Sequence, residues 1–353
     1  MVGDTRRSCQ PAILGPWQLT MELIDLTIIW VGIIGLGMFM YVLMDGFDLG
    51  VGILFPFAPS DQCRDAMMNS VAPVWDGNET WLILGGAGLL AAFPLIYVVF
   101  LPALYLGVFL MLAGLIFRGI AFEFRFKAGP RRYWWDRSFF GGSTIASFAQ
   151  GAVVGAYIQG FETEGFQYVG GPLDWLTPFT VMTGLGVVAG YALLGVTWTI
   201  MKTEGPTQAW AYKLAPWLLG IVIGFFIVVS AWTPLANERV MSRWLDNLNW
   251  LWIFPVLTIS LSLWVFHRLR LRAEVTPFLG CMGLFAMFYL GLLISQWPYA
   301  VPPDHTFWDA ASDPGSQLFL LIGVVFLIPV ILVYTAWTYW VFRGKVDSSG
   351  YGH

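Results

Sequence analysis

The sequence has little charge, few cysteines and almost no histidine for its length. Only 11% of its 353 residues are charged, whereas 58% are hydrophobic and the mean hydropathy is +0.69. These values lie far outside those of soluble domains. The three cysteines, Cys9, Cys63 and Cys281, are odd in number and far apart, which excludes a disulfide framework and argues against a zinc site. The composition therefore predicts an all-α polytopic membrane protein.

Ligands for metals are equally scarce. The only histidines are His267, His305 and His353, and each falls at the end of an apolar span, in a loop or at the C-terminus. Haem iron needs an axial His, Met, Cys or Tyr in an apolar pocket. The 13 methionines leave a thioether ligand open, but methionine more often fills gaps in a core. We expect this chain to ligate neither a metal nor a haem. The sequence has no basic patch interleaved with aromatic residues, so no nucleic-acid partner is expected.

Apolar segments of membrane-spanning length recur along the whole chain. The second and third are separated only by Pro94 and Pro102, which predicts an antiparallel helix hairpin there. The longest loops, about 45–79 and 122–138, are too short for a soluble domain. We predict nine transmembrane helices near 22–44, 80–99, 102–121, 139–161, 176–200, 214–233, 250–268, 276–296 and 317–342.

The basic residues predict the orientation. With nine spans, 14 of the 18 Lys and Arg residues fall in or beside the loops on the same side as the C-terminus. The positive-inside rule then places the C-terminus, with a short tail over 346–353, in the cytoplasm and the N-terminus outside. Residues 1–20 lack the apolar core of a signal peptide, so they are either a natural extension or precede a true start at Met21.

Two acids follow the first span directly. Asp45 and Asp48 are three residues apart, so they share a face if the first helix continues through them. Gly46 and Gly50 would let another backbone approach closely. The pair forms either a polar turn at the helix end or a proton-accepting pair at a membrane entrance.

Asp76 and Glu79 lie just before the second span. Asp76 can act as the N-cap of that helix, with Glu79 reaching back as in a capping box. The alternative is that Asp76 relays protons, and one residue can do both.

Arg118 lies near the end of the third span and is followed by Glu123. A long basic side chain at this depth commonly extends to the lipid headgroups. Alternatively, Arg118 is the buried partner of Asp48, Asp76 or Glu123, because buried charges in a membrane pair with one another.

The fourth span carries small residues at every fourth position, which form one stripe that favours close helix packing. Gln150, in the same span, can bond across a helix interface. The stripe consists of Ser143, Ser147, Gly151 and Gly155.

Six segments combine into a specific pattern: Asp45–Gly50, Asn69–Leu82, Phe93–Pro94, Phe117–Arg125, Trp308–Ser312 and Tyr334–Trp340. Together they closely resemble subunit II of cytochrome bd-type quinol oxidases. The similarity runs from about residue 21 to 345, and the segments 117–127 and 147–161 resemble the cyanide-insensitive branch.

The resemblance implies a heterodimer in the bacterial inner membrane. Subunit I would carry haems b and d and oxidise quinol from the membrane pool, while this chain would be a haem-free partner surrounded by lipid. The implied fold is two four-helix bundles, about 21–161 and 176–296, plus a peripheral helix over 317–342. The resemblance leaves open whether a quinone binds this chain and whether a small accessory subunit attaches.

The resemblance also implies roles for single residues. Asp48 matches the second acid of the family's DGFD run and Asp76 the acid of its WDGN run, and both are implied in a cytoplasmic proton route. Structural or supporting roles are implied for Asp45, Trp75, Asn78, Glu79, Arg118 and Glu123.

Three functional hypotheses follow from these observations. The leading one is an accessory subunit that supports quinol oxidation coupled to reduction of O2 to water, with protons from the cytoplasm. The second is a secondary transporter or channel, which intramembrane acids would also suit. The third is a purely structural partner of the haem-bearing subunit.

Overall fold

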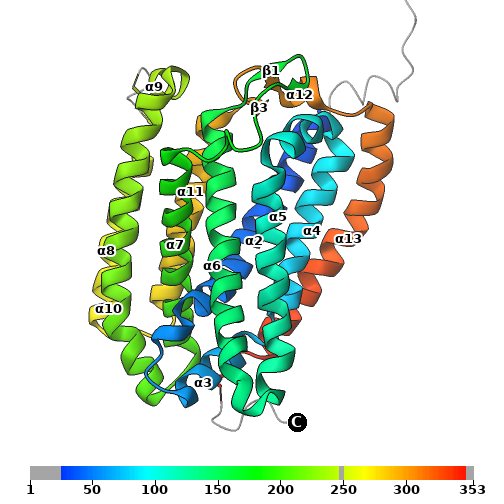
Figure 1. Ribbon diagram of the computed structural model, residues 1–353. Coiled ribbons are helices and arrows are strands. Elements are labelled where there is room, and N and C mark those ends of the chain that lie inside the picture. The colour runs from blue at the N-terminus through cyan, green and yellow to red at the C-terminus, as the bar shows by residue number, and fades with distance from the viewer. Residues whose placement is uncertain (1–24, 246–249, 347–353) are drawn as a thin grey trace, which may run out of the picture.

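The computed structural model describes residues 25–245 and 250–346, and these are almost entirely helical (Figure 1). The long helices are α2 (Leu26–Leu54), α4 (Trp75–Ala92), α5 (Pro94–Phe124), α6 (Arg132–Gln159), α7 (Pro178–Lys202), α8 (Gly205–Ala236), α10 (Ile253–Arg270), α11 (Thr276–Gln296) and α13 (Pro314–Val341). The short helices are α3 (Asp61–Val71), α9 (Glu238–Leu245) and α12 (Phe307–Ala310), with single 3-10 turns at Phe55–Phe57, Arg125–Lys127 and Gly129–Arg131.

The predicted all-α membrane class is confirmed. Among the described residues, six helical segments are long and apolar enough to cross a membrane. The predicted count of nine spans stays a prediction, because α4, α6 and α10 fall outside this set. The six segments are Leu26–Phe57, Pro94–Lys127, Pro178–Lys202, Gly205–Leu235, Thr276–Gln296 and Pro314–Val341.

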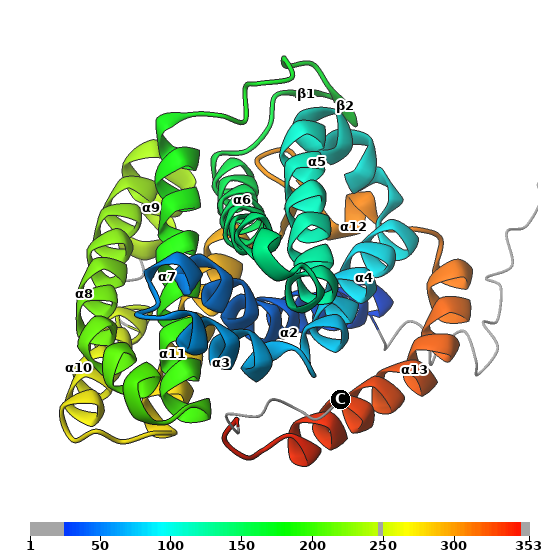
Figure 2. The same cartoon turned by 60° about the horizontal axis from the view of Figure 1, so that its bottom comes forward.

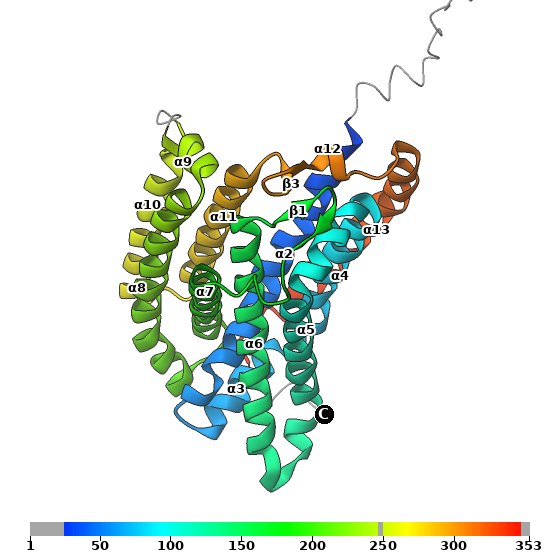
Figure 3. The same ribbon diagram turned by 45° about the horizontal axis from the view of Figure 1, so that its top comes forward.

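The two ends of the helices differ. One end, the hairpin end, carries two antiparallel hairpins together with α9 and α12 (Figures 1 and 3). The opposite end, the α3 end, carries α3 and the described C-terminal residues 342–346 (Figure 1). The loops rich in Lys and Arg gather at the α3 end. The hairpins are β1 (Thr163–Glu164) with β2 (Gln167–Tyr168), and β3 (Tyr299–Val301) with β4 (His305–Thr306).

The first helix is longer than predicted. We expected it to end near residue 44, but α2 continues to Leu54 and holds both Asp45 and Asp48 inside the helix, fully buried. The idea of a polar turn at the helix end is therefore wrong. The helix continues because its backbone hydrogen bonds are kept and both acids find polar partners on other helices.

The break between the second and third spans was also misplaced. The helices separate at Phe93, and Pro94 occupies the first turn of α5, where the missing N–H is tolerated. Pro102 lies inside α5 rather than between two helices. The predicted hairpin therefore turns at Phe93, before the break that we expected between residues 99 and 102.

Helices α2 and α7 cross in near backbone contact. A Cβ atom at Gly50 would lie 1.8 Å from the Tyr191 carbonyl oxygen, and one at Gly195 would lie 2.3 Å from the Gly50 carbonyl carbon. Next to this crossing, Phe47 stacks on Trp198 with ring centroids 4.0 Å apart. Glycine is required at the crossing because any side chain would push the two backbones apart.

The small-residue stripe of α6 lies buried against two helices. Ser143 contacts α2 at Gly52, while Gly151 faces α7, where an added Cβ would lie 2.6 Å from the Thr183 carbonyl oxygen. Ser147 and Gly155 of the stripe are buried as well. The stripe thus allows α6 to pack closely beside both α2 and α7.

Helix α13 lies apart from the other long helices, as the view from the α3 end shows (Figure 2). Only 6% of its most apolar window is buried within the chain. Its two ends are the exceptions. Near its start, the Gln317 carbonyl accepts a 3.1 Å hydrogen bond from Trp30 Nε1 of α2, and its last turns reach back toward α2, α4 and α7.

Candidate functional site

A buried ionic cluster joins α2, α4 and α5 in the half of the helices nearer the α3 end. The Arg118 side chain is 0% exposed and its Nη1 atom lies 2.5 Å from Asp45 Oδ1. Its Nη2 atom pairs with the Glu79 carboxylate on α4. Arg118 therefore does not extend to the headgroups. Its partners are Asp45 and Glu79, so the three partners that we had considered, Asp48, Asp76 and Glu123, are wrong.

Asp48 belongs to the same region but pairs with an amide instead of a cation. The Asn78 side-chain NH2 donates to Asp48 Oδ2 at 2.6 Å and to the Met44 carbonyl at 3.2 Å. The Tyr339 hydroxyl on α13 donates to Asn78 Oδ1 at 2.9 Å. The other carboxylate oxygen of Asp48 is buried and has no protein partner among the described residues.

A second polar chain follows α2 toward the hairpin end. Tyr41 lies one turn before Asp45 on the same face, and its hydroxyl accepts a 2.7 Å hydrogen bond from Gln150 Nε2. Tyr191 on α7 donates to Gln150 Oε1 at 2.8 Å. Gln150 thus bonds across two helix interfaces, and its tyrosine partners could not be predicted from the sequence.

Asp76 does not occupy the N-cap position that the capping hypothesis predicted. The N-cap of α4 is Val74 and makes no side-chain cap bond, so Asp76 lies in the first helical turn and is exposed. Glu79 turns to Arg118 instead of reaching back. The capping box is therefore wrong, because the buried guanidinium offers Glu79 a stronger, charge-assisted partner.

Two other predicted residues lie at the margin of the ionic cluster. Trp75 stacks on Phe122 with centroids 4.9 Å apart, and the Arg118 guanidinium lies 5.8 Å from the Trp75 ring. Glu123 is exposed and makes no ion pair with any residue between 25 and 245 or between 250 and 346. Trp75 therefore lies at the edge of the ionic cluster and packs against it, while Glu123 lies outside the cluster.

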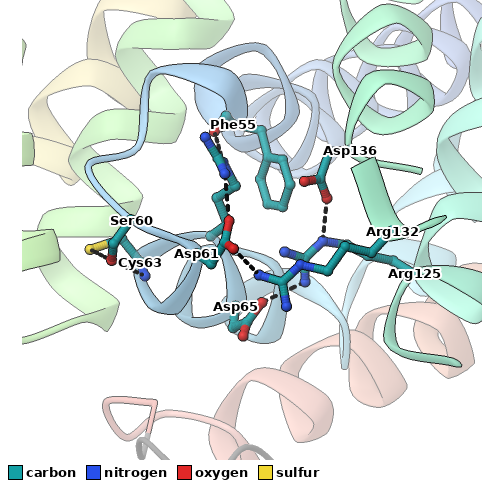
Figure 4. Close-up of polar contacts among 9 residues, drawn as sticks. Phe55, Ser60, Asp61, Cys63, Asp65, Arg125, Arg132 and Asp136 are labelled. Carbon is teal, nitrogen blue, oxygen red and sulfur yellow. Dashed lines mark hydrogen bonds and ion pairs between the residues drawn. The ribbon is translucent and has the colours of Figure 1, made fainter. Parts of the chain in front are cut away.

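A separate ion-pair network at the α3 end escaped the sequence analysis (Figure 4). Arg125, only 1% exposed, lies 2.6 Å from Asp65 of α3 and 2.5 Å from Asp136 of α6. Arg132 lies 2.7 Å from Asp61. The network ties α3 to the start of α6. Spacing along the chain could not reveal it, because its acids and bases come from different helices.

The His and Cys side chains of the described residues do not gather in one place. No group of three or more His, Cys, Asp or Glu side chains gathers among them in a metal-binding arrangement. His267 is exposed on α10, and the Nε2 atom of His305 bonds the Gly165 carbonyl oxygen at 2.6 Å. His353 and Cys9 lie outside the described residues.

Comparisons with known proteins show the family of this chain. The family model for cytochrome bd terminal oxidase subunit II matches residues 26–342. The chain is 31% identical to the Escherichia coli K12 cytochrome bd-I ubiquinol oxidase subunit 2, over 92% of this chain and 96% of that protein. It is 27% identical to the Bacillus subtilis cytochrome bd ubiquinol oxidase subunit 2, with the same coverage.

A solved structure shows the same fold. A chain of the bd oxidase from Geobacillus thermodenitrificans superposes with a TM-score of 0.73 at 17% identity, covering 88% of this chain and 98% of that one. The comparisons give no support to the transporter or channel hypothesis. By the extent of the family match, this chain belongs to the family of cytochrome bd terminal oxidase subunit II.

Proposed function

We propose that this chain is the haem-free subunit of an inner-membrane oxidase that oxidises quinol and reduces O2 to water. Its curated relatives are named as subunits of ubiquinol oxidases, which supports the reaction. The chemistry takes place on haems b and d of a haem-bearing partner subunit. The present chain supports that partner and brings it protons from the cytoplasm. A quinone or a small accessory subunit bound to this chain is compatible with the proposal but is not required by it.

The observation that carries the proton role is the composition of the buried cluster. Three carboxylates, those of Asp45, Asp48 and Glu79, lie in the cluster with a single cation, Arg118, which pairs with Asp45 and Glu79, while Asp48 accepts from the Asn78 amide. The cluster thus has more carboxylates than cations, and chains of Asp, Glu and His side chains within a membrane are typical of proton relays. Exposed Asp76 lies one turn before Glu79 on the same face of α4 and offers an entrance from the α3 end.

The proposed direction of proton uptake requires the α3 end to face the cytoplasm. A reporter that is active only in the cytoplasm should therefore work when fused after Tyr351 and fail when fused after Asp304 between β3 and β4. The physical reason is the concentration of Lys and Arg at the α3 end, which resists translocation. A reporter active only outside serves as the control and should give the reverse pattern. Cytoplasmic activity at both positions would refute the topology.

Substitution of Asp76 tests the proton role itself. Asn has nearly the same shape as Asp but cannot bind and release a proton. Because Asp76 makes no cap bond, Asp76→Asn loses only a favourable interaction with the helix dipole, worth about 0.3–1 kcal/mol. We expect the purified complex to keep its full haem content while quinol-driven O2 uptake slows by about tenfold or more.

The control for this experiment is Glu204→Gln, which removes another exposed carboxylate at the α3 end. Its O2 uptake should stay near that of the parent complex. Normal uptake by the Asp76→Asn complex at full haem content would remove Asp76 from the proton route. A similar slowing in both variants would point to surface charge in general.

A further inference from the structure

Tyr339 carries a hydroxyl group of α13 into the polar interior, and the family match leaves this residue without a role. Its ring packs edge-on against Phe47 and Trp198, with centroids 6.5 and 6.3 Å away. Its hydroxyl points at Asn78 and donates to the amide oxygen at 2.9 Å. The residue is therefore held by aromatic packing on one side and by a single hydrogen bond on the other.

That hydrogen bond fixes which way the Asn78 amide points. With its oxygen bonded to Tyr339, the amide presents its NH2 group to Asp48 and to the Met44 carbonyl. Without the hydroxyl, the amide can rotate by half a turn when Asp48 carries a proton, since its oxygen can then accept from the protonated carboxyl group. Tyr339 thus keeps a donor aimed at Asp48 through both states of that acid.

The end of α13 is anchored so that Tyr339 stays in place. Lys202, at the end of α7 and 4% exposed, donates from Nζ to the Gly344 carbonyl at 2.8 Å and also to the Phe342 carbonyl. The Val346 N–H returns a 2.8 Å hydrogen bond to the Lys202 carbonyl. These bonds hold the chain directly after Tyr339, although the body of the helix lies apart from the bundle.

We propose that Tyr339 is a positioning residue for proton transfer at Asp48, acting through the Asn78 amide and held in register by the Lys202 anchor. The proposal rests on the proton role assigned above to Asp48. It gives the peripheral helix a specific task within the buried cluster, beyond contact with lipid or a partner subunit.

The test compares Tyr339→Phe with a matched control in the complex purified with its haem-bearing partner. Phe keeps the ring that packs on Phe47 and Trp198, so full haem content is expected. Quinol-driven O2 uptake should fall about fivefold, as expected for one lost hydrogen bond, and its pH profile should change. The control is Tyr289→Phe, which removes a 2.7 Å hydrogen bond to the Gly35 carbonyl of α2, outside the cluster. Its uptake should stay within about twofold of the parent.

A double-mutant cycle shows whether Tyr339 acts through Asn78. In an Asn78→Ala background, the added Tyr339→Phe change should have no further effect on O2 uptake. The proposal is overturned if Tyr339→Phe slows uptake equally in the Asn78→Ala background. It is also overturned if the Tyr339→Phe complex loses haem while the Tyr289→Phe complex does not, or if Tyr339→Phe alone leaves uptake normal.

The Asp48→Asn variant distinguishes failure of the positioning role of Tyr339 from failure of the proton role of Asp48. Slow uptake with Asp48→Asn beside normal uptake with Tyr339→Phe refutes only the positioning role, whereas normal uptake with Asp48→Asn refutes the proton role of Asp48.

Discussion

Replacing Arg118 by methionine is expected to abolish assembly of the oxidase complex. Methionine fills a similar volume but leaves Asp45 and Glu79 without their cation, and Asp45 is fully buried. Removing one partner of a buried ion pair typically costs about 3–5 kcal/mol, a large fraction of the stability of most proteins. The measurement is the haem content per amount of membrane protein, together with the amount of this chain in the membrane.

Two further variants test the reason for that loss. Arg118→Lys keeps the charge but cannot bridge both carboxylates with a planar fork, so partial assembly is expected. Combining Arg118→Met with Asp45→Asn and Glu79→Gln removes all three charges and should assemble better than Arg118→Met alone. Full haem content in the single Arg118→Met variant would show that the complex does not depend on this ion pair.

Gly50→Ala should disrupt the crossing of α2 and α7. The added methyl group would lie 1.8 Å from the Tyr191 carbonyl oxygen and 2.8 Å from the Gly195 nitrogen, both of them backbone atoms that no side-chain rotation can move away. Overpacking commonly costs about 1–3 kcal/mol, and displacement of two backbones places this site at or above the upper end. We expect a sharp fall in the thermal stability of the purified complex, followed by loss of haem on heating.

Gly32→Ala on the same helix is the matched control, because an added Cβ at Gly32 meets no atom within 4 Å. Alanine is the better helix former by about 1 kcal/mol, so this variant should be as stable as the parent or slightly more stable. Equal thermal stability of the two variants would contradict the close crossing.

The sequence predicted the helical class and the location of the polar site, because both depend on local composition. A charged run in an apolar chain is conspicuous wherever it occurs, and Asp45, Asp48 and Arg118 proved to be buried in one cluster, with the partly buried Glu79 at its edge. The extension of α2 through Asp48 was harder to predict. Two acids after an apolar span are typical of a helix end, and only their partners on α4 and α5 explain why the helix continues through them.

The hydrogen bonds and ion pairs between side chains of different helices could not be predicted from the sequence. The capping spacing of Asp76 and Glu79 is genuine, but a tertiary contact with Arg118 outcompeted the local one. Gln150 and Tyr339 met their partners 41 and 261 residues away along the chain. Nothing in the local spacing of a tyrosine or a glutamine indicates such distant contacts.

The order of Asp48, Asn78 and Tyr339 along the chain has a consequence for biogenesis. Asp48 and Asn78, on α2 and α4, are synthesised long before α13, which carries the hydroxyl that completes their hydrogen bonding. The backbone that Lys202 holds lies beyond that helix again. The buried polar centre is thus finished only after α13 has been synthesised and has packed against α2 and α4, so a nascent chain interrupted before α13 carries an incomplete site.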